Sequence, residues 1–351
     1  MLPEWIQINT KKINEQSKTL AESRQQQLTK PPGSLGRLEQ LALQFAAMQS
    51  NEFPHAEQVH IIVFAADHGI AETGVSAFPQ VVTTEMIKNF SRGGAAISVL
   101  AKQLGAELRV VDVGSVTSPG ELPGVIDARI AAGTENFLKT SAMSLSQCED
   151  ALNIGRQQIS EITEQRCDLF IAGEMGIANT TSATALACFW LDKPAVQLTG
   201  PGTGLDKSGV LEKAKIIDQA IAHHRKSMRS DLSVLQTLGG FEIVAMCGAY
   251  IAAAQAGIPI LVDGLISTIA FYAAVKLNNG VLDWGVFAHR SAEPGHHFLL
   301  EALDAEPIIE FDMRLGEASG AAVVVNLIRS AFDLHNNMAT FDEAGVSTGD
   351  N

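Results

Sequence analysis

The chain has 351 residues, a length that favours two domains or one large domain with a small one attached. Apolar residues make up 46% of it and charged residues only 18%, against about 25% in an average globular protein, so it can bury a large core and is neither disordered nor fibrous. Its 39 acidic and 25 basic residues give a net charge of −14, which repels a phosphate polymer at long range. Without a block rich in Lys and Arg, we expect no nucleic-acid or membrane partner, although a local pocket can still bind a single nucleotide.

Targeting and redox features are sparse. The four cysteines are scattered without a CxxC pair, so a disulfide framework is not expected. The N-terminal segment is polar, which predicts no signal peptide. The apolar stretch 243–262 is interrupted by Pro259 and favours a buried helix followed by a buried strand over a membrane span. We therefore expect a cytoplasmic protein.

In chain order, residues 5–50 predict helix, broken at residues 30–34, with Ser34 as the cap of the second piece. From residue 59 onward, short β-branched runs alternate with helical patterns, which predicts a parallel sheet covered by helices on both faces. Residues 51–332 would form this α/β domain, and residues 1–50 and 333–351 together a small helical domain. The expected strands are 59–65, 108–113, 169–172, 195–199, 258–262 and 308–311. The expected helices are 81–104, 144–163, 179–190, 209–225, 241–256, 265–276, 296–304 and 317–332.

Small and polar residues follow most of the expected strands. Parallel sheets bind ligands at the carboxyl ends of their strands. Five of the six strands are followed by Gly beside polar or acidic residues, and this convergence predicts a ligand pocket at that edge. The segments are Asp67-His68-Gly69, Gly173–Thr181, Gly200–Gly204, Asp263-Gly264 and Arg314–Gly320.

Two of these segments suit a phosphate group. The turn Gly200–Gly204 precedes a helix that carries Lys213, so it is either a plain turn or a cradle of amides for one phosphate. It matches neither the Walker loop nor GxGxxG, which disfavours a dinucleotide. Asn179, Thr180 and Thr181 open a helix, where they either cap it or contact a ligand as well.

The titratable residues leave several alternatives open. Glu317, at the start of a helix, either interacts with the helix dipole, which lowers its pKa, or serves as a general base, whose pKa an apolar pocket raises. Asp67 and His68 form either an acid/base pair or a polar turn. The neighbouring histidines 223–224 and 296–297 point in different directions on a helix, so no metal site is expected. No GxSxG elbow is present.

Five segments resemble the nicotinate-nucleotide–dimethylbenzimidazole phosphoribosyltransferase family, in order, over residues ~28 to ~332. They are Lys30–Glu39 (KPPGSLGRLE), Ala66–Gly69 (ADHG), Gly173–Thr181 (GEMGIANTT), Gly239–Glu242 (GGFE) and Arg314–Gly320 (RLGEASG). The resemblance implies a Rossmann-like α/β domain with a small helical domain, assembled as a homodimer. It implies transfer of phosphoribosyl from nicotinate mononucleotide to 5,6-dimethylbenzimidazole, as in assembly of the lower ligand of cobalamin. It implies no metal and no bound cofactor.

The resemblance also assigns roles. The catalytic base of the family falls on Glu317, and we expect Glu174 to be a second carboxylate of the active site. Phosphate and ribose would be bound by Gly176, Ile177, Ala178, Asn179, Gly202, Thr203, Lys213 and Ser291. The aromatic base would be bound by Phe78, Pro79, Met86, Met175 and Leu315.

The identity of the base stays open. Phe78 and Met86 stand where some relatives carry polar residues, so they either make the base pocket more apolar or simply pack in the core. A related enzyme that uses another lower-ligand base, adenine or a phenol, is one alternative. A nucleotide-binding module without turnover is another, and the presence of Glu317 argues against it.

Overall fold

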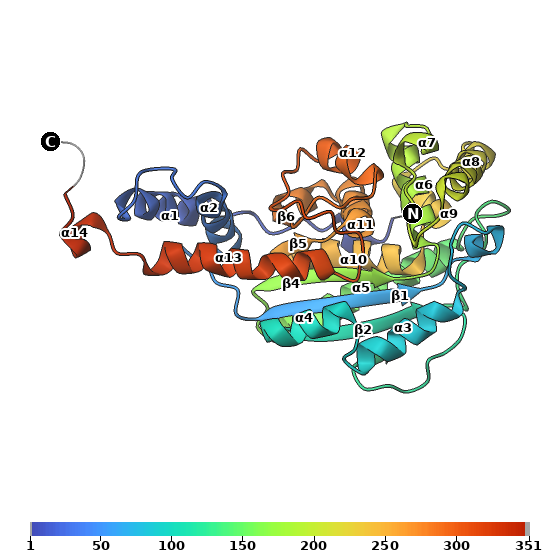
Figure 1. Cartoon of the computed structure of the whole chain (residues 1–351), viewed down its shortest axis with the longest axis horizontal. Helices are drawn as coiled ribbons and strands as arrows, with labels where there is room; N and C mark the ends of the chain where they lie inside the picture. Colours follow the sequence, from blue (N-terminus) through green and yellow to red (C-terminus); the bar gives the residue numbers. More distant parts are fainter. Residues whose placement is uncertain (1, 348–351) are drawn as a thin grey trace.

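A computed structural model describes residues 2–347 of the chain. At its centre lies a parallel sheet of six strands in the order β3-β2-β1-β4-β5-β6 (Figure 1). β1 is buried along its whole length and pairs with β2 on one side and β4 on the other. The strands are β1 (Val59–Ala66), β2 (Glu107–Gly114), β3 (Val125–Asp127), β4 (Leu169–Met175), β5 (Ile260–Val262) and β6 (Gly285–Phe287).

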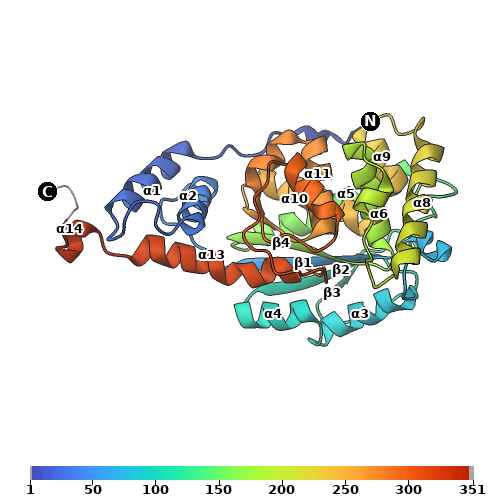
Figure 2. The same ribbon diagram turned by 45° about the horizontal axis from the view of Figure 1, so that its top comes forward.

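Helices cover both faces of the sheet, which confirms the predicted α/β fold. α5, α10 and α11 pack on one face, and α3, α4 and the start of α13 lie on the other (Figure 2). α6, α7, α8 and α9 form a further group beside the carboxyl ends of the central strands (Figure 1). The helices are α1 (Glu15–Gln27), α2 (Arg37–Gln49), α3 (Val81–Ser91), α4 (Ala96–Leu104), α5 (Leu145–Thr163), α6 (Asn179–Leu191), α7 (Ala195–Leu198), α8 (Lys207–His224), α9 (Asp231–Leu238), α10 (Phe241–Ala256), α11 (Leu265–Leu277), α12 (Gly295–Ala302), α13 (Ser319–Asn337) and α14 (Phe341–Ala344), with 3-10 turns η1 (Glu4–Gln7), η2 (Gly69–Thr73) and η3 (Asn279–Trp284).

The strand predicted at 195–199 is wrong, because these residues form the short helix α7. Pro194 precedes the helix with φ −66°, and the Ala195 amide donates to Asp218 Oδ1 at 3.0 Å. Val196 is 60% exposed, so the run has no sheet neighbour to cover it. A short apolar run does not by itself distinguish a strand from a buried helical turn, and here helix contacts decide.

The outer part of the sheet also departs from the prediction. The strand expected at 308–311 shrinks to one isolated bridge between His289 and Ile309. The edge strands β3 and β6, of three residues each, and the helix α9 are absent from the prediction. The helix expected over 81–104 is split into α3 and α4 at Gly93, whose φ of +80° breaks the helix.

The predicted helix over residues 5–50 is interrupted more than expected. Residues 8–14 are not helical, and they lie against α10, where the Lys11 amide donates to the Ala254 carbonyl at 3.2 Å. Gly36, not Ser34, occupies the N-cap of α2. The expected buried helix and strand within 243–262 are confirmed as α10 and β5. Among the described residues, no helix is both long and apolar enough to cross a membrane.

α1 and α2 pack together beside the far half of α13 (Figures 1 and 2). Leu28 forms a bridge to Thr340, and Arg24 donates to the carbonyls of His335, Asn336 and Met338 near the end of α13. These contacts join the two ends of the chain. The assignment of 1–50 and 333–351 to a separate domain stays a prediction, and residues 1 and 348–351 lie outside the described part.

Candidate active site

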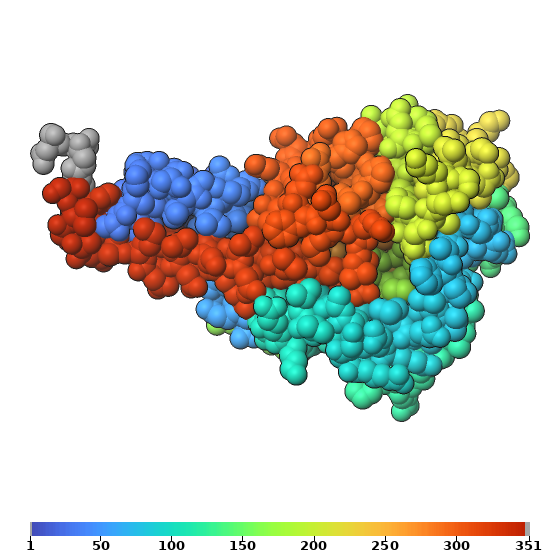
Figure 3. Space-filling model, viewed as in Figure 1, coloured from blue at the N-terminus to red at the C-terminus, as the bar shows by residue number. Residues whose placement is uncertain are grey.

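A cavity of about 670 Å³ opens at the carboxyl ends of the central strands. Figure 3 shows the surface hollowed where the orange-red, cyan and yellow-green segments meet. Its walls come from the start of α3, the end of β4, the 202–203 loop, the 263–267 turn, the loop after β6 and the segment before α13. The strand ends therefore converge on one pocket, as the sequence predicted.

The pocket brings together most of the predicted site residues. Those that line it are Glu317, Glu174, Gly176, Ile177, Asn179, Gly202, Thr203, Ser291, Phe78, Met86, Met175 and Leu315. Three predicted residues do not line it. Pro79 is exposed just before α3, and Ala178 is buried at the N-cap of α6.

Lys213, the third of them, lies one layer behind the wall. It is 1% exposed, and its Nζ donates to Thr180 Oγ1 at 2.8 Å, while Thr180 itself lines the pocket. Burial lowers the pKa of Lys213 to about 8, although the carboxylate of Glu293 raises it in part. A Cβ at Gly202 would lie 2.7 Å from Thr180 Oγ1 and 3.3 Å from Lys213 Nζ, so glycine lets the loop approach both groups closely.

Glu317 sits on a turn of unusual backbone geometry. Gly316, Glu317 and Ala318 all have positive φ, at 85°, 61° and 66°, a region that residues other than glycine rarely adopt. The turn lies directly on β4, because a Cβ at Gly173 would be 2.6 Å from the Ala318 nitrogen. Glycine at 173 thus allows β4 to support the turn that carries Glu317.

Burial of the Glu317 carboxyl raises its pKa to about 7. The nearby Ile97 amide lowers this pKa, whereas the charge of Asp263 raises it. Oε2 of Glu317 has no hydrogen-bond partner among the described residues. A different carboxylate interacts with the N-terminal end of α13: Asp263 Oδ1 accepts a hydrogen bond from the Ala321 amide at 2.7 Å. The surroundings of Glu317 therefore favour a general base of raised pKa over a carboxylate that interacts with the helix dipole.

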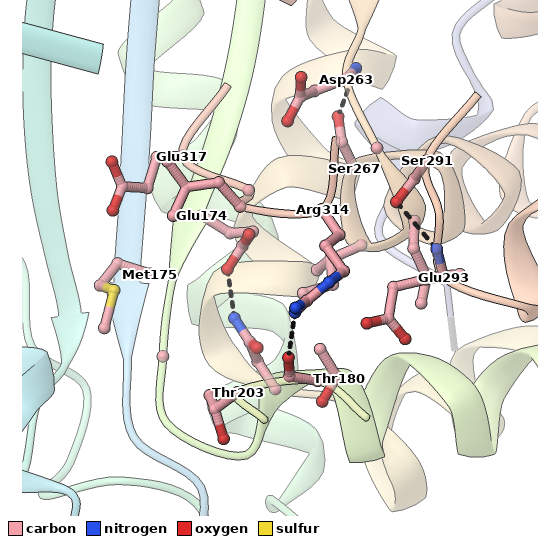
Figure 4. A pocket seen from close by; sticks show the side chains of 18 of the residues that line it. Glu174, Met175, Thr180, Thr203, Asp263, Ser267, Ser291, Glu293, Arg314 and Glu317 are labelled. Carbon is pink, nitrogen blue, oxygen red and sulfur yellow. Dashed lines mark hydrogen bonds between the residues drawn. The ribbon is translucent and has the colours of Figure 1, made fainter. Parts of the chain in front are cut away.

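Glu174 lies in the middle of the pocket (Figure 4). The Asn179 side chain donates to it, and Gly316 leaves the space that its Oε1 occupies. Burial raises the pKa of Glu174 well above its usual value, the charge of Glu242 raises it further, and Asn179 lowers it. The two predicted carboxyls are thus both shifted toward the neutral form. Asn179 contacts Glu174 and does not cap α6.

Two threonines tie the pocket loops together. The Ile177 amide donates to Thr83 Oγ1 at 3.1 Å, so this amide is already satisfied inside the protein. Thr203 Oγ1 accepts from the Ala77 amide at 3.2 Å and lies 3.0 Å from Ser76 Oγ. The glycine loop is therefore fastened to the segment that carries Phe78.

The comparisons with known proteins cover almost the whole chain. The family profile described as phosphoribosyltransferase matches residues 10–346. A nicotinate-nucleotide–dimethylbenzimidazole phosphoribosyltransferase of Xanthomonas axonopodis pv. citri is 56% identical over 94% of this chain and 94% of its own length. Another of that name, from Xanthomonas campestris pv. campestris, is 54% identical over 98% of this chain and 99% of its own. The chain belongs to this phosphoribosyltransferase family.

Solved structures agree with this membership. The crystal structure of CobT from Thermus thermophilus matches with a TM-score of 0.91 at 39% identity, over 95% of this chain and all of that one. A second structure from the same organism, titled as the nicotinate-nucleotide–dimethylbenzimidazole phosphoribosyltransferase, gives a TM-score of 0.90 at 38% identity, over 96% of this chain and all of that one. The phosphoribosyltransferase fold is thus shared over nearly the full length, including the segments that build the pocket.

The structure adds pocket residues that the sequence reasoning did not assign. Thr180, Asp263 and Arg314 line the pocket. They belong to the glycine-rich segments that follow the expected strands, so the pattern that predicted the pocket already included them. His289 and Glu293 also line it, but they follow β6, which is too short to predict. Four carboxyl groups therefore share one phosphoribosyltransferase pocket: Glu174, Asp263, Glu293 and Glu317.

The Asp67-His68-Gly69 motif supports the pocket from behind. Asp67 accepts from Thr83 Oγ1 at 2.6 Å and from the Val116 amide at 2.8 Å. His68 Nε2 lies 2.7 Å from Glu242 Oε1, and neither side chain is exposed. Neither Asp67 nor His68 lines the cavity, so the motif builds a buried turn in this structure.

One cluster of the described residues has the geometry of metal ligands. The ligand atoms of His55, Glu57 and Asp168 lie within 4.8 Å of one another. Arg166 already pairs with both carboxylates, at 2.9 Å from Glu57 and 3.0 Å from Asp168, so ion pairing accounts for the cluster.

One of the neighbouring histidines has a structural role beside the pocket. His296 accepts from the Ser291 amide at 2.8 Å and contacts Thr268, and it is fully buried. Burial lowers the pKa of His296 to about 3. It therefore positions the pocket loop as a neutral ring.

Proposed function

We propose that this phosphoribosyltransferase transfers the phosphoribosyl group from nicotinate mononucleotide to 5,6-dimethylbenzimidazole, with Glu317 as the general base. The products are α-ribazole 5′-phosphate and nicotinate. The observation that carries the proposal is a buried carboxyl of raised pKa in the pocket of a chain whose full-length relatives bear this name. The presence of Glu317 disfavours a binding module without turnover.

The chemistry needs one proton acceptor. As one benzimidazole nitrogen attacks the anomeric carbon, the N–H proton of the other passes to the Glu317 carboxylate. The bond between the anomeric carbon and nicotinate breaks, and its electron pair neutralises the pyridinium nitrogen, so no acid is needed for the leaving group. A base with a pKa near the working pH serves this step best, and the pKa of Glu317 is about 7.

The pocket has two ends that suit the two parts of the reaction. Figure 4 shows Glu317 and Met175 on one side of Glu174, and Glu293, Thr180 and Ser291 on the other. We place the aromatic base beside Glu317, and Phe78, Met86 and Leu315 line the same cavity. The phosphate belongs at the other end, near Gly202 and Lys213. Catalysis beyond the proton transfer is then positioning of the two substrates.

Replacing Lys213 with alanine is expected to raise the KM for nicotinate mononucleotide, by roughly tenfold or more, with a smaller change in kcat. The reason is that Lys213 is the buried cation nearest to Gly202. Steady-state kinetics at saturating dimethylbenzimidazole measure this effect, with the exposed Lys215 of the same helix as the site of a control substitution. An unchanged KM would remove Lys213 from the phosphate subsite.

The test of the function is release of nicotinate from nicotinate mononucleotide, with and without dimethylbenzimidazole, followed by mass identification of the product. Release that depends on the base, with an α-ribazole phosphate product, is the expected result. Competition with adenine and with phenols then ranks the bases, because a phenol requires activation of a hydroxyl group instead of a ring nitrogen. Absence of release with every base would contradict the proposal.

Two further features belong to the same proposal. We expect a homodimer, which sedimentation of the purified protein tests. We also expect the enzyme in the cytoplasm, which fractionation of the source cells tests.

A further inference from the structure

Glu293 is a buried carboxylate that the proposed mechanism does not use. It lies in the loop between β6 and α12, is 6% exposed and lines the pocket. Its amide donates to Ser291 Oγ at 3.3 Å, whereas its Oε1 has no hydrogen-bond partner among the described residues. Its Oε2 lies against Gly200, where any side chain would collide with it.

Cationic and amide groups gather around this carboxylate. Figure 4 shows it below Ser291 and beside Arg314, with its carboxyl group on the side of Thr180. Arg314 Nη1 donates to the Gly202 carbonyl at 3.2 Å, and Lys213 Nζ lies behind Gly202 and Thr180. Within residues 2–347, no carboxylate approaches Lys213 Nζ within the 4 Å of an ion pair, yet Glu293 is the charge that raises its pKa. Glu293 therefore places a carboxyl group where the substrate phosphate is expected.

We propose that Glu293 is an internal counter-anion of the phosphate subsite: it balances Lys213 and Arg314 while the pocket is empty, and takes up a proton when the substrate phosphate arrives. The proposal rests on the proposed function only in that the pocket receives a phosphorylated ribose. One proton from solvent enters with the dianionic phosphate and forms an O–H bond on the Glu293 carboxyl group, and no other covalent bond changes.

The electrostatics of the loop favour this exchange. Burial raises the pKa of Glu293, and Lys213, the Gly202 amide and Arg314 lower it. A phosphate that engages these three groups removes their stabilisation of the carboxylate and adds repulsion, so the pKa of Glu293 rises further in the complex. The other titratable groups that line the pocket are Glu174, Asp263, His289 and Glu317, and none of the three carboxyls can neutralise Glu293. His296, nearby on α12, has a pKa of about 3 and stays neutral.

The charge-removing variant Glu293→Gln tests the proposal directly. Calorimetry measures binding of inorganic phosphate and, without dimethylbenzimidazole, of nicotinate mononucleotide at pH 7.5. We expect both to bind about fivefold to tenfold more tightly than to the native chain, since glutamine keeps the shape and removes the repulsion. The difference in affinity between Glu293→Gln and the native chain should shrink toward pH 5.5, because more of the native Glu293 is protonated there. Glu301→Gln, at an exposed position on α12, removes one charge outside the pocket and should change neither affinity.

Affinity that is unchanged or lower in Glu293→Gln overturns the proposal, because Glu293 would then only hold the Gly200–Gly204 loop in place. If this variant fails to fold, proton uptake by the native protein decides. Calorimetry at pH 7.0 in two buffers of different ionisation enthalpy counts protons bound with nicotinate mononucleotide. At this pH Lys213, with a pKa of about 8, is mostly charged already. Because Glu317 in the same pocket has a pKa of about 7, the count is repeated in Glu317→Gln. Uptake that persists in this variant supports the proposal, and its absence there overturns it.

Neither measurement requires turnover. If nicotinate is never released but Glu293→Gln still binds phosphate more tightly, the proposed reaction fails and the counter-anion stands. If nicotinate is released and Glu293→Gln binds phosphate no better, the proposed reaction is supported and the counter-anion proposal fails. The two proposals are therefore tested independently.

Discussion

Glu317→Gln is expected to lower kcat by about 10²- to 10⁴-fold while binding of nicotinate mononucleotide is kept. Glutamine has the shape of the glutamic acid side chain but cannot accept the benzimidazole proton. The turn itself should survive, because Gly316, Glu317 and Ala318 are held through the backbone on β4. Single-turnover measurement of nicotinate release, with both substrates saturating, separates the chemical step from binding.

The pH dependence gives this prediction a second readout. In the native enzyme, kcat/KM should rise with pH through an apparent pKa near 7, because the base must be deprotonated to act and the pKa of Glu317 is about 7. This rise should disappear from the residual activity of Glu317→Gln. Glu310→Gln is the matched control: Glu310 is exposed, pairs only with Arg290 at 3.6 Å among the described residues, and should keep the native rate and profile. Near-native turnover by Glu317→Gln would assign the base to another group.

The interior of the sheet could be predicted because it reads as solid apolar runs. β1, β2 and β4 are long enough to be recognised, and α10 is apolar except for Glu242, Gly248 and Gln255. The three-residue strands β3 and β6 are too short to show a period, and β5, which is equally short, was predicted only because the longer apolar run 258–262 contains it. The run 195–199 has the composition of a strand, but it packs against α6, α8 and α12, so tertiary contacts override its local preference.

The pocket could be predicted for a geometric reason: parallel strands end at the same edge, so the residues that follow them meet. This rule placed Glu174 and Glu317 at the pocket, although the strand expected before Glu317 shrinks to one bridge, and their catalytic roles came from the family resemblance. Glu293 was not, because no recognisable strand precedes it, and its burial beside Lys213 depends on two segments far apart in the chain. Sequence reasoning also cannot tell that Lys213 lies behind Thr180 instead of at the surface of the cavity. Such depth depends on packing, which no spacing rule encodes.

Gly173→Ala is expected to lower kcat by about 10²-fold or more without touching a side chain of the pocket, because catalytic groups displaced by about 1 Å lose that much rate. A Cβ at this position would lie 2.6 Å from both the Ala318 nitrogen and the Glu317 carbonyl carbon. Those atoms belong to the backbone of the turn and cannot rotate away as the end of a side chain can. Gly173 is paired with Val63 of β1, so β4 cannot retreat either. The turn, and Glu317 with it, must therefore move.

Overpacking at Gly173 should also cost about 1–3 kcal/mol of stability, so Tm has to be measured with the activity, and kinetics run well below it. Gly209→Ala is the matched control. Its added Cβ would lie 3.2 Å from Leu205 Cδ2, the end of a flexible side chain, and alanine favours the helix α8 that contains it. This control should keep native activity. If Gly173→Ala also kept it, the contact between β4 and the turn would not be what positions Glu317, and its left-handed backbone would have to be maintained by the helix α13 alone.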